Sequence, residues 1–308
     1  MDRRAVNIRK GFLRGVLPFV RLLPLPMASR FLSGIGRFEY RMSKGVRAAF
    51  DSAVLQGGKT LRCDWDVPAV GERLAGNHIL WRSRDLLLDG PSKERALRMF
   101  DVEGREHLDA ALAQKKGCVL LTSHFGAHML PAHWLYRQDY PLRLYMERPR
   151  NVSKFMIDRF TDDGELSQGK LFISRRGGST DAASSILRAV RVLRSGMMLF
   201  LAGDVRWSGQ LTAEAHFMGQ TQRFSTTWIA LAAMSQAPVV PVFCRIGDDD
   251  RYHLEFQPSF QVPRDAQQED KSSAYAQRFL DLLEEQVRRY PSNSNEYLFW
   301  KEPEEVAV

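Results

Sequence analysis

The 308-residue chain has 44% hydrophobic and 26% charged residues, a globular composition that excludes a disordered or low-complexity protein. Its three cysteines, Cys63, Cys118 and Cys244, are too few and too widely spaced for a disulfide framework or a zinc site, so we expect no metal and a cytoplasmic location. The net charge is +8, but residues 1–50 hold eleven basic and two acidic residues, which leaves −1 for the remainder and no support for nucleic-acid binding.

Residues 1–50 combine this basic charge with apolar residues, and prolines divide them into short helical pieces. The longest uncharged run, Leu22 to Ser29, has eight residues, whereas a spanning helix needs about 20. The segment therefore predicts an amphipathic element that binds the anionic inner face of the cytoplasmic membrane peripherally. The alternative is a helical layer that packs on the rest of the chain with its charges in solvent.

Residues 51–105 are predicted to form a second helical region, in which one helix ends at Gly57-Gly58 and another at Gly90-Pro91. Residues 106–308 then alternate between strands and helices. Strands are predicted at 118–122, 142–147, 170–174, 197–203, 237–246 and 252–260, and helices at 128–136, 181–193, 226–235 and 274–290. This order predicts an α/β fold with a mostly parallel central sheet flanked by helices, preceded by an N-terminal helical region.

Polar residues stand at the carboxyl ends of three predicted strands. His124 follows the apolar run 118–122, Asp204 follows 197–203, and Glu147 ends 142–147. The carboxyl ends of parallel strands share one edge of a sheet, where ligands bind. We therefore expect His124 and Asp204 to face one crevice, with Glu147 as the competing acid. A carboxylate within about 4–6 Å favours the protonated form of an imidazole.

Five stretches carry a resemblance to a known family. They are "EGREHLDAALAQKKGCVLLTSHFG", "YMERPRN", "ILRAVRVLRSGMMLFLAGD", "FMGQTQRFSTTWIALAAMSQAPVVPVFCRI" and "YPSNSNEYLFW". Their order and spacing resemble the bacterial late acyltransferases of lipid A biosynthesis, a branch of the lysophospholipid acyltransferase superfamily. The similarity runs from about residue 100 to Trp300.

The resemblance implies that His124 is a general base, which takes a proton from an acceptor hydroxyl or amine as that group attacks an acyl thioester. The family's H-x4-D/E pattern begins at His124-Phe125-Gly126, but Met129 stands where the acid is expected. An acid that orients a histidine is important, because neutralising the aspartate of a serine-protease triad lowers kcat about 10⁴-fold. We therefore predict that His124 and Asp204 are the catalytic residues and that Asp204 supplies support that Met129 cannot.

The same resemblance suggests residues that contact substrate. Arg148 in "MERPRN" matches a family arginine and is expected to hold a phosphate or the developing oxyanion. Phe217 and Gly219 lie in a stretch similar to one that lines the family's acyl site. His128 and Glu147 complete the predicted substrate-binding set.

The implied acyl donor is a thioester of acyl carrier protein or coenzyme A, which acts as a co-substrate, and no separate cofactor is expected. The acceptor is a lipid or another amphiphile, including one from specialised secondary metabolism. Two other hypotheses remain. A catalytically degenerate protein of this fold would bind acyl chains or a carrier protein, and a thioester hydrolase would use water as the acceptor.

Overall fold

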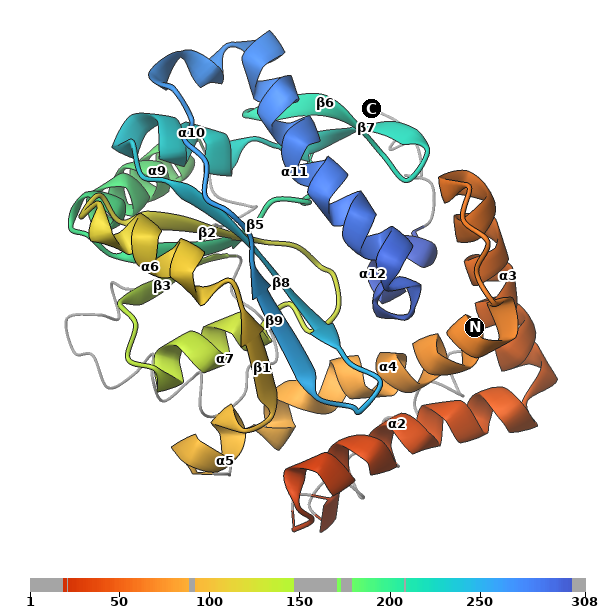
Figure 1. Cartoon of the computed structure of the whole chain (residues 1–308). Coiled ribbons are helices and arrows are strands. Elements are labelled where there is room, and N and C mark those ends of the chain that lie inside the picture. Colours follow the sequence, from red (N-terminus) through yellow and green to blue (C-terminus); the bar gives the residue numbers. More distant parts are fainter. Residues whose placement is uncertain are drawn as a thin grey trace.

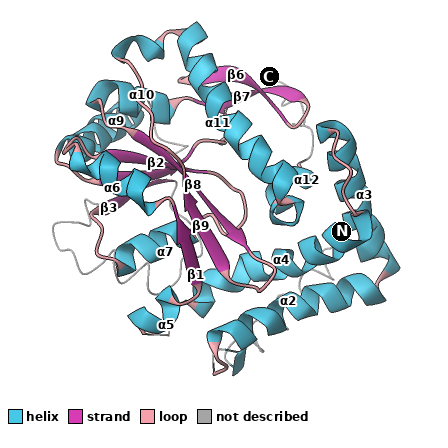
Figure 2. Ribbon diagram, viewed as in Figure 1, coloured by secondary structure: helices cyan, strands magenta, loops and turns pink. Residues whose placement is uncertain are grey.

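The computed structural model describes residues 19–20, 22–88, 92–146, 171–172, 179–207 and 209–300 of the chain. A twisted sheet lies between two layers of helices, and a further layer of helices from the N-terminal part lies along one side (Figure 1, Figure 2). The predicted α/β architecture with an N-terminal helical region is confirmed.

Seven strands of the described residues form the central sheet. In sheet order they are β1 (Phe100–Glu103), β9 (Tyr252–Phe256), β8 (Val239–Ile246), β2 (Cys118–Thr122), β5 (Met198–Ala202), β3 (Leu142–Met146) and β4 (Leu171–Phe172). Neighbours from β8 to β4 are parallel, whereas β9 is antiparallel to β8 and β1 is parallel to β9. The prediction that the first 105 residues are all helical is wrong at β1. A strand of four residues is too short to show strand periodicity in the sequence.

Helices cover both faces of the sheet. One face carries α6 (Arg105–Ala113) and α7 (Leu130–Arg137), and the other carries α9 (Ser179–Arg194), α10 (Thr227–Ser235) and α11 (Glu269–Arg289). The alternation of side chains along β2 explains this, since Cys118 and Leu120 join one core cluster and Val119 and Leu121 the other. A strand that is buried on both faces is typical of parallel sheets.

Smaller elements complete this part of the chain. They are the antiparallel hairpin β6 (Thr212–Phe217) and β7 (Gln220–Ser225), the 3₁₀ turns η2 (Arg264–Gln267) and η3 (Pro291–Asn293), and the short helix α12 (Asn295–Leu298). The hairpin was not predicted as strands. It is joined to α11, whose Gln277 side chain hydrogen-bonds both the N–H and the C=O of His216.

The N-terminal helical layer consists of α2 (Leu25–Met42), α3 (Lys44–Leu61), α4 (Val67–Leu87) and the short α5 (Lys93–Leu97). α3 continues through Gly57-Gly58, although the sequence predicted that the helix ends there. The role of these glycines is to let side chains of other segments approach the helix closely. A Cβ on Gly57 would lie 2.3 Å from Leu298 Cδ2. None of the helices that the structure describes is both long and apolar enough to cross a membrane.

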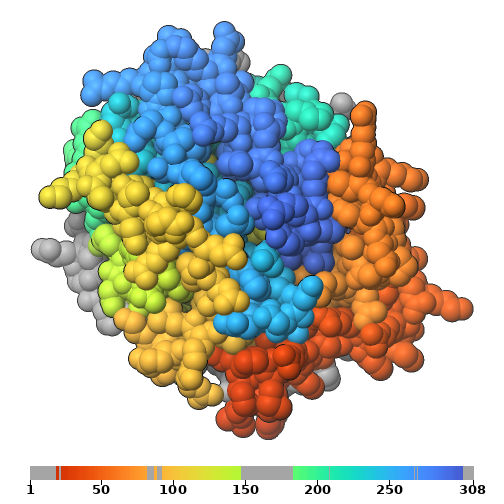
Figure 3. Space-filling model, in the orientation of Figure 1, coloured from red at the N-terminus to blue at the C-terminus, as the bar shows by residue number. Residues whose placement is uncertain are grey.

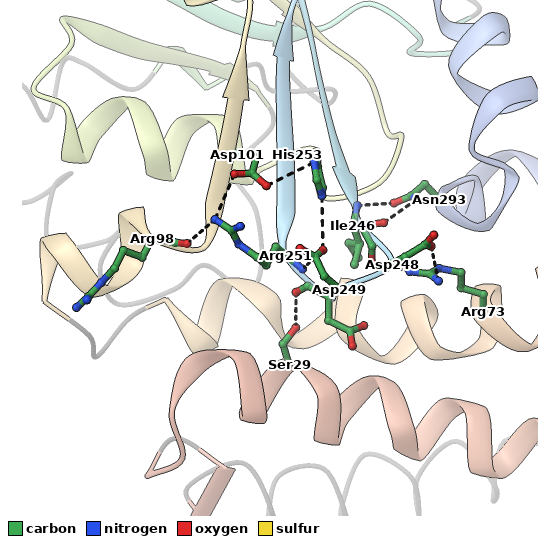
Figure 4. Close-up of polar contacts among 12 residues, drawn as sticks. Ser29, Arg73, Arg98, Asp101, Ile246, Asp248, Asp249, Arg251, His253 and Asn293 are labelled. Carbon is green, nitrogen blue, oxygen red and sulfur yellow. Dashed lines mark hydrogen bonds and ion pairs between the residues drawn. The ribbon is translucent and has the colours of Figure 1, made fainter.

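α2 is fixed to its neighbours by close contacts. A Cβ on Gly36 would lie 2.2 Å from the Ala75 carbonyl oxygen of α4. The turn between β8 and β9 reaches both helices (Figure 4), since the Ser29 hydroxyl donates to the Asp250 carbonyl (3.0 Å) and the Arg73 guanidinium donates to the Gly247 carbonyl (2.6 Å). The helices of this layer are therefore attached to the sheet as well as to one another.

Two glycines of α2 give a matched test of this packing. Gly36→Ala is expected to lower the free energy of unfolding by roughly 1–3 kcal/mol, because its methyl group must displace the backbone of α4. Gly34→Ala meets nothing within 4 Å, and alanine is favoured in a helix by up to about 1 kcal/mol, so this variant is expected to be neutral or more stable. Urea unfolding at neutral pH measures both. Equal effects would contradict the close approach of α2 and α4.

Candidate active site

The register of two adjacent strands places His124 beside Asp204. β2 and β5 run parallel, and Thr122 at the end of one pairs with Ala202 at the end of the other. The Gly203 N–H donates to the Thr122 carbonyl (2.8 Å), which extends the pairing by one residue. His124 and Asp204 each follow two residues after these strand ends. Equal offsets from paired residues bring the two side chains together at the carboxyl edge of the sheet, and the proximity predicted from sequence is observed.

The Asp204 carboxylate contacts His124 at two points. The His124 backbone N–H donates to Oδ2 (2.9 Å), and Nδ1 of the imidazole lies 3.1 Å from both carboxylate oxygens. The Asp204 side chain is completely buried, whereas 38% of the His124 side chain is exposed. One edge of the imidazole therefore faces a buried acid while the ring still reaches solvent.

Tyr297 of α12 supplies a further donor to the same carboxylate. Its hydroxyl donates to Asp204 Oδ2 (2.7 Å), and the Ser123 side chain hydrogen-bonds the tyrosine in turn. Burial opposes ionisation of Asp204, but the His124 ring and the donated hydrogen bonds outweigh it and lower the pKa of Asp204. Burial and the negative charge of Asp204 raise the pKa of Tyr297 well above its usual range, so the hydroxyl keeps its proton.

The contact of Nδ1 with Asp204, together with the lowered pKa of that carboxyl, indicates the tautomer of His124. An ionised carboxylate only accepts hydrogen bonds, so Nδ1 of His124 must carry a proton to bond to Asp204. The neutral imidazole then has its lone pair on Nε2. The arrangement is suited to general-base chemistry, since Nε2 accepts a proton and Asp204 stabilises the resulting positive ring.

The turn after His124 is fixed by segments distant in the sequence. Gly126 has φ +55°, and a Cβ there would lie 2.3 Å from the Cys244 carbonyl of β8. Its N–H donates to the Asn293 carbonyl (2.8 Å). The Asn293 side chain also bonds the N–H and the C=O of Ile246 (2.7 and 3.2 Å), as Figure 4 shows. His124 therefore stands on a turn held by both β8 and the C-terminal segment.

His128 and Met129 take different places. The His128 ring centroid lies 5.1 Å from that of His124 and 6.3 Å from that of Trp81, so a second imidazole adjoins the candidate base. Met129 is the residue before α7 and packs half-buried against the apolar core. The side chain at the position predicted for the family's acid is thus a core contact.

The other predicted substrate residues are less directly connected to His124. Phe217 is buried, and its ring centroid lies 5.1 Å from that of Tyr297, so it supports the tyrosine that bonds Asp204. Gly219 lies in the β6–β7 turn, where a Cβ would approach Thr60 of α3 to 2.5 Å. Direct contact of either with substrate stays a prediction. Glu147 and Arg148 lie outside the described residues.

Three side chains of this site were missed by the sequence analysis. They are Ser123, Asn293 and Tyr297. The last two lie in "YPSNSNEYLFW", which the sequence offered only as a point of resemblance. Its run of small polar residues between aromatic ones was the available signal, because polar side chains that are buried need partners elsewhere in the fold.

Comparison with known proteins now gives the site its context. The profile described as "Bacterial lipid A biosynthesis acyltransferase" matches residues 87–299, more than half of the chain and the whole of the site. The chain belongs to this acyltransferase family. It is also similar to the lipid A biosynthesis lauroyltransferase of Escherichia coli (strain K12), with 26% identity over 254 residues, which cover 79% of this chain and 76% of the relative.

The buried carboxylate predicts a pH-dependent contribution to stability. Asp204→Asn is expected to lower the free energy of unfolding at pH 7 by roughly 1–3 kcal/mol, because it replaces the acceptor for three donors. The pKa of Asp204 is lower in the folded state. Its contribution is therefore complete above the unfolded pKa of about 3.9 and is lost as the pH falls through the lower folded value.

Urea unfolding measures this contribution to the free energy of unfolding. The native protein and Asp204→Asn are compared at neutral pH and at a series of pH values below about 4. The difference in the free energy of unfolding between the two proteins should become smaller only in the acidic range. A difference that stays constant down to the lowest pH would show that the ionised carboxylate is not what stabilises this part of the fold.

Proposed function

We propose that the protein is an acyltransferase that moves an acyl group from a thioester of acyl carrier protein or coenzyme A to a hydroxyl or amine of a lipid or amphiphile. His124 is the general base. The observation that carries the proposal is the contact of 3.1 Å between His124 Nδ1 and the buried Asp204 at the carboxyl edge of a parallel sheet. Family membership supports the class of reaction.

The proposed step follows from the tautomer of His124. Nε2 removes the proton from the acceptor, whose oxygen or nitrogen attacks the carbonyl carbon of the thioester. A C–O or C–N bond forms and the C–S bond breaks. The protonated imidazole then returns its proton to the leaving thiolate, which gives a free thiol. Asp204 stabilises the positive ring between the two proton transfers.

Asp204 takes the supporting role in this proposal because the methionine at position 129 has no carboxylate. The carboxylate receives hydrogen bonds from the His124 backbone and from Tyr297, so its position is set before substrate arrives. We assign Tyr297 as a positioning residue, since its hydroxyl bonds Asp204 and acts on His124 through that carboxylate. Preorganised charge of this kind needs no rearrangement during the reaction.

The substrate contacts of the proposal rest on different observations. His128 adjoins His124 and is assigned to the acceptor. Arg148, with Glu147 beside it in the sequence, is assigned to a phosphate of the donor or to the oxyanion, on sequence resemblance alone. Phe217 and Gly219 are assigned to the acyl chain on the same basis.

The absence of the family's acid at position 129 favours an acceptor other than a lipid A precursor, such as a specialised metabolite. An amine with an appreciable neutral fraction needs less help from a base than a hydroxyl does. An amphiphilic acceptor also fits a peripheral position on the inner face of the cytoplasmic membrane, which the basic N-terminal segment favours.

Two alternatives use the same fold. A degenerate protein that only binds acyl chains or carrier protein has no use for a buried ionised carboxylate bonded to an accessible imidazole, and this observation favours the enzyme. A thioester hydrolase would use the same pair of residues with water. Thiol release that needs no added acceptor would identify the hydrolase, and acylated product would identify the transferase.

The central prediction concerns the catalytic pair. His124→Ala is expected to lower kcat by at least about 10³-fold and Asp204→Asn by about 10²–10⁴-fold, as for other histidines that lose an orienting acid. The acidic limb of the pH–rate profile of Asp204→Asn should move to lower pH, because a carboxylate no longer favours the charged ring. Thiol release and mass spectrometry of products, with acyl carrier protein and coenzyme A donors and a host lipid and metabolite extract, measure this.

His216→Ala is the matched control, because this histidine lies exposed on β6 and bonds α11 only through its backbone. It should keep the native rate. An active His124→Ala protein would remove the general base from the proposal. Product formation that is lost equally in both variants would point to damage to the fold.

Tyr297 is tested separately. Tyr297→Phe keeps the aromatic packing but removes one of three hydrogen-bond donors to Asp204, so we expect kcat to fall by about tenfold with KM unchanged. The measurement is kcat and KM together with the urea midpoint. A rise in KM with kcat unchanged would instead place Tyr297 at substrate binding, against the positioning role.

A further inference from the structure

The outer face of α2 is apolar, although it faces away from the protein. Met27, Phe31, Phe38 and Met42 are 54%, 47%, 64% and 70% exposed. Their spacing of four, seven and four residues puts them on one side of a helix. The opposite side is buried, from Ala28 to Tyr40, and packs on α4. A surface helix of a soluble protein normally turns its polar side to water, so α2 has an apolar stripe that nothing in the described chain covers.

Basic residues border this stripe. Arg30 and Arg41 lie on α2 and are exposed, and the exposed Lys44 begins α3 two residues after the end of α2. Arg41 is also paired with Glu72 of α4 at 2.6 Å. The acid of α2 itself, Glu39, is half-buried and lies off the stripe. The surface is therefore apolar along its centre with positive charge at its edge.

The stripe cannot turn inward without breaking contacts. Gly36 fits against the backbone of α4, and the Arg37 guanidinium lies 3.6 Å from the buried carboxylate of Asp250 in the β8–β9 turn. The Ser29 hydroxyl bonds the same turn, as Figure 4 shows. In Figure 3, α2 lies at the lower edge of the molecule. The exposed stripe is thus a fixed feature of the fold.

We propose that the outer face of α2 docks on an anionic phospholipid bilayer, with the helix lying in the plane of the interface. Phe31 and Phe38 enter the boundary between headgroups and acyl chains, and Arg30 and Lys44 contact lipid phosphates. Charge complementarity selects this occupant, because two copies of the chain would bring equal positive edges together. The proposal is independent of the chemistry proposed for His124, and it names the residues that make the contact.

The test uses the full-length protein and vesicles of phosphatidylcholine with and without phosphatidylglycerol. The native protein should bind the anionic vesicles, and Phe31→Asp/Phe38→Asp should bind them at least about tenfold more weakly, which corresponds to about 1.4 kcal/mol. Leu187→Asp is the matched control, since Leu187 is 52% exposed on α9, away from α2, and this variant should bind like the native protein. Arg30→Gln/Lys44→Gln should weaken the binding and reduce its dependence on salt.

Several results would overturn the proposal. Native binding by the Phe31→Asp/Phe38→Asp protein would assign membrane attachment to another segment. Equal binding to both kinds of vesicle would remove the role of anionic lipid. A dimer in lipid-free solution that Phe31→Asp/Phe38→Asp converts to a monomer, seen by light scattering, would show that α2 binds a second copy.

Two measurements keep this proposal separate from the catalytic one. His124→Ala should bind anionic vesicles like the native protein, whatever its activity. Phe31→Asp/Phe38→Asp should keep native circular dichroism, and it should release thiol from a soluble acyl-coenzyme A at the native rate. Loss of that activity with native vesicle binding would contradict the docking role of these two residues.

Discussion

A buried negative charge is the constraint on which the site depends. The Asp204 carboxylate has no exposed surface, and an isolated carboxylate in such a place is too costly to remain ionised. It is stabilised by the backbone and the ring of His124 and by the hydroxyl of Tyr297. Each donor comes from a different requirement of the fold: the β2–β5 register, the tautomer of an imidazole, and the docking of α12. If any of these shifts, the charge loses a partner.

The sequence predicted the parts of this arrangement that follow from local patterns. Apolar runs at 118–122 and 197–203 identify buried strands, and the rule that parallel strands end at a common edge brings His124 and Asp204 together. The fold class followed from the alternation of strands and helices. The position of Asp204 as partner of His124 needed only these two inferences, since both residues closely follow the ends of their strands.

Other features depend on tertiary contacts that no local pattern records. Tyr297 lies on a four-residue helix, and only the packing of that helix shows that its hydroxyl meets Asp204. β1 is a strand because it pairs in parallel with β9, which is far from it in the sequence. The end of α3 was misplaced because Gly57 was interpreted as a helix breaker, whereas its role is to admit Leu298. The assignments of Glu147 and Arg148 still rest on sequence alone.

The helical layer and the catalytic edge share a segment. The Asn77 amide of α4 donates to the Ser292 carbonyl (2.9 Å), and the ring of Phe50 in α3 lies 5.1 Å from that of Phe299. The segment 291–299 thus contacts the N-terminal helices, and its residues Asn293 and Tyr297 contact the catalytic edge. A surface attached through α2 would therefore hold the catalytic edge in a fixed orientation to it.

The long sequence distances within the site bear on how the protein is made. Asp204 is 80 residues from His124 and 93 residues from Tyr297. Contacts over such separations are slow to form, because the closure of a long loop costs conformational entropy. A chain still being synthesised, with α12 not yet released from the ribosome, has the histidine but lacks one of the groups that hold its acid. The complete catalytic edge consequently forms only after Tyr297 has been synthesised, and a product that stops before this residue lacks one donor to Asp204.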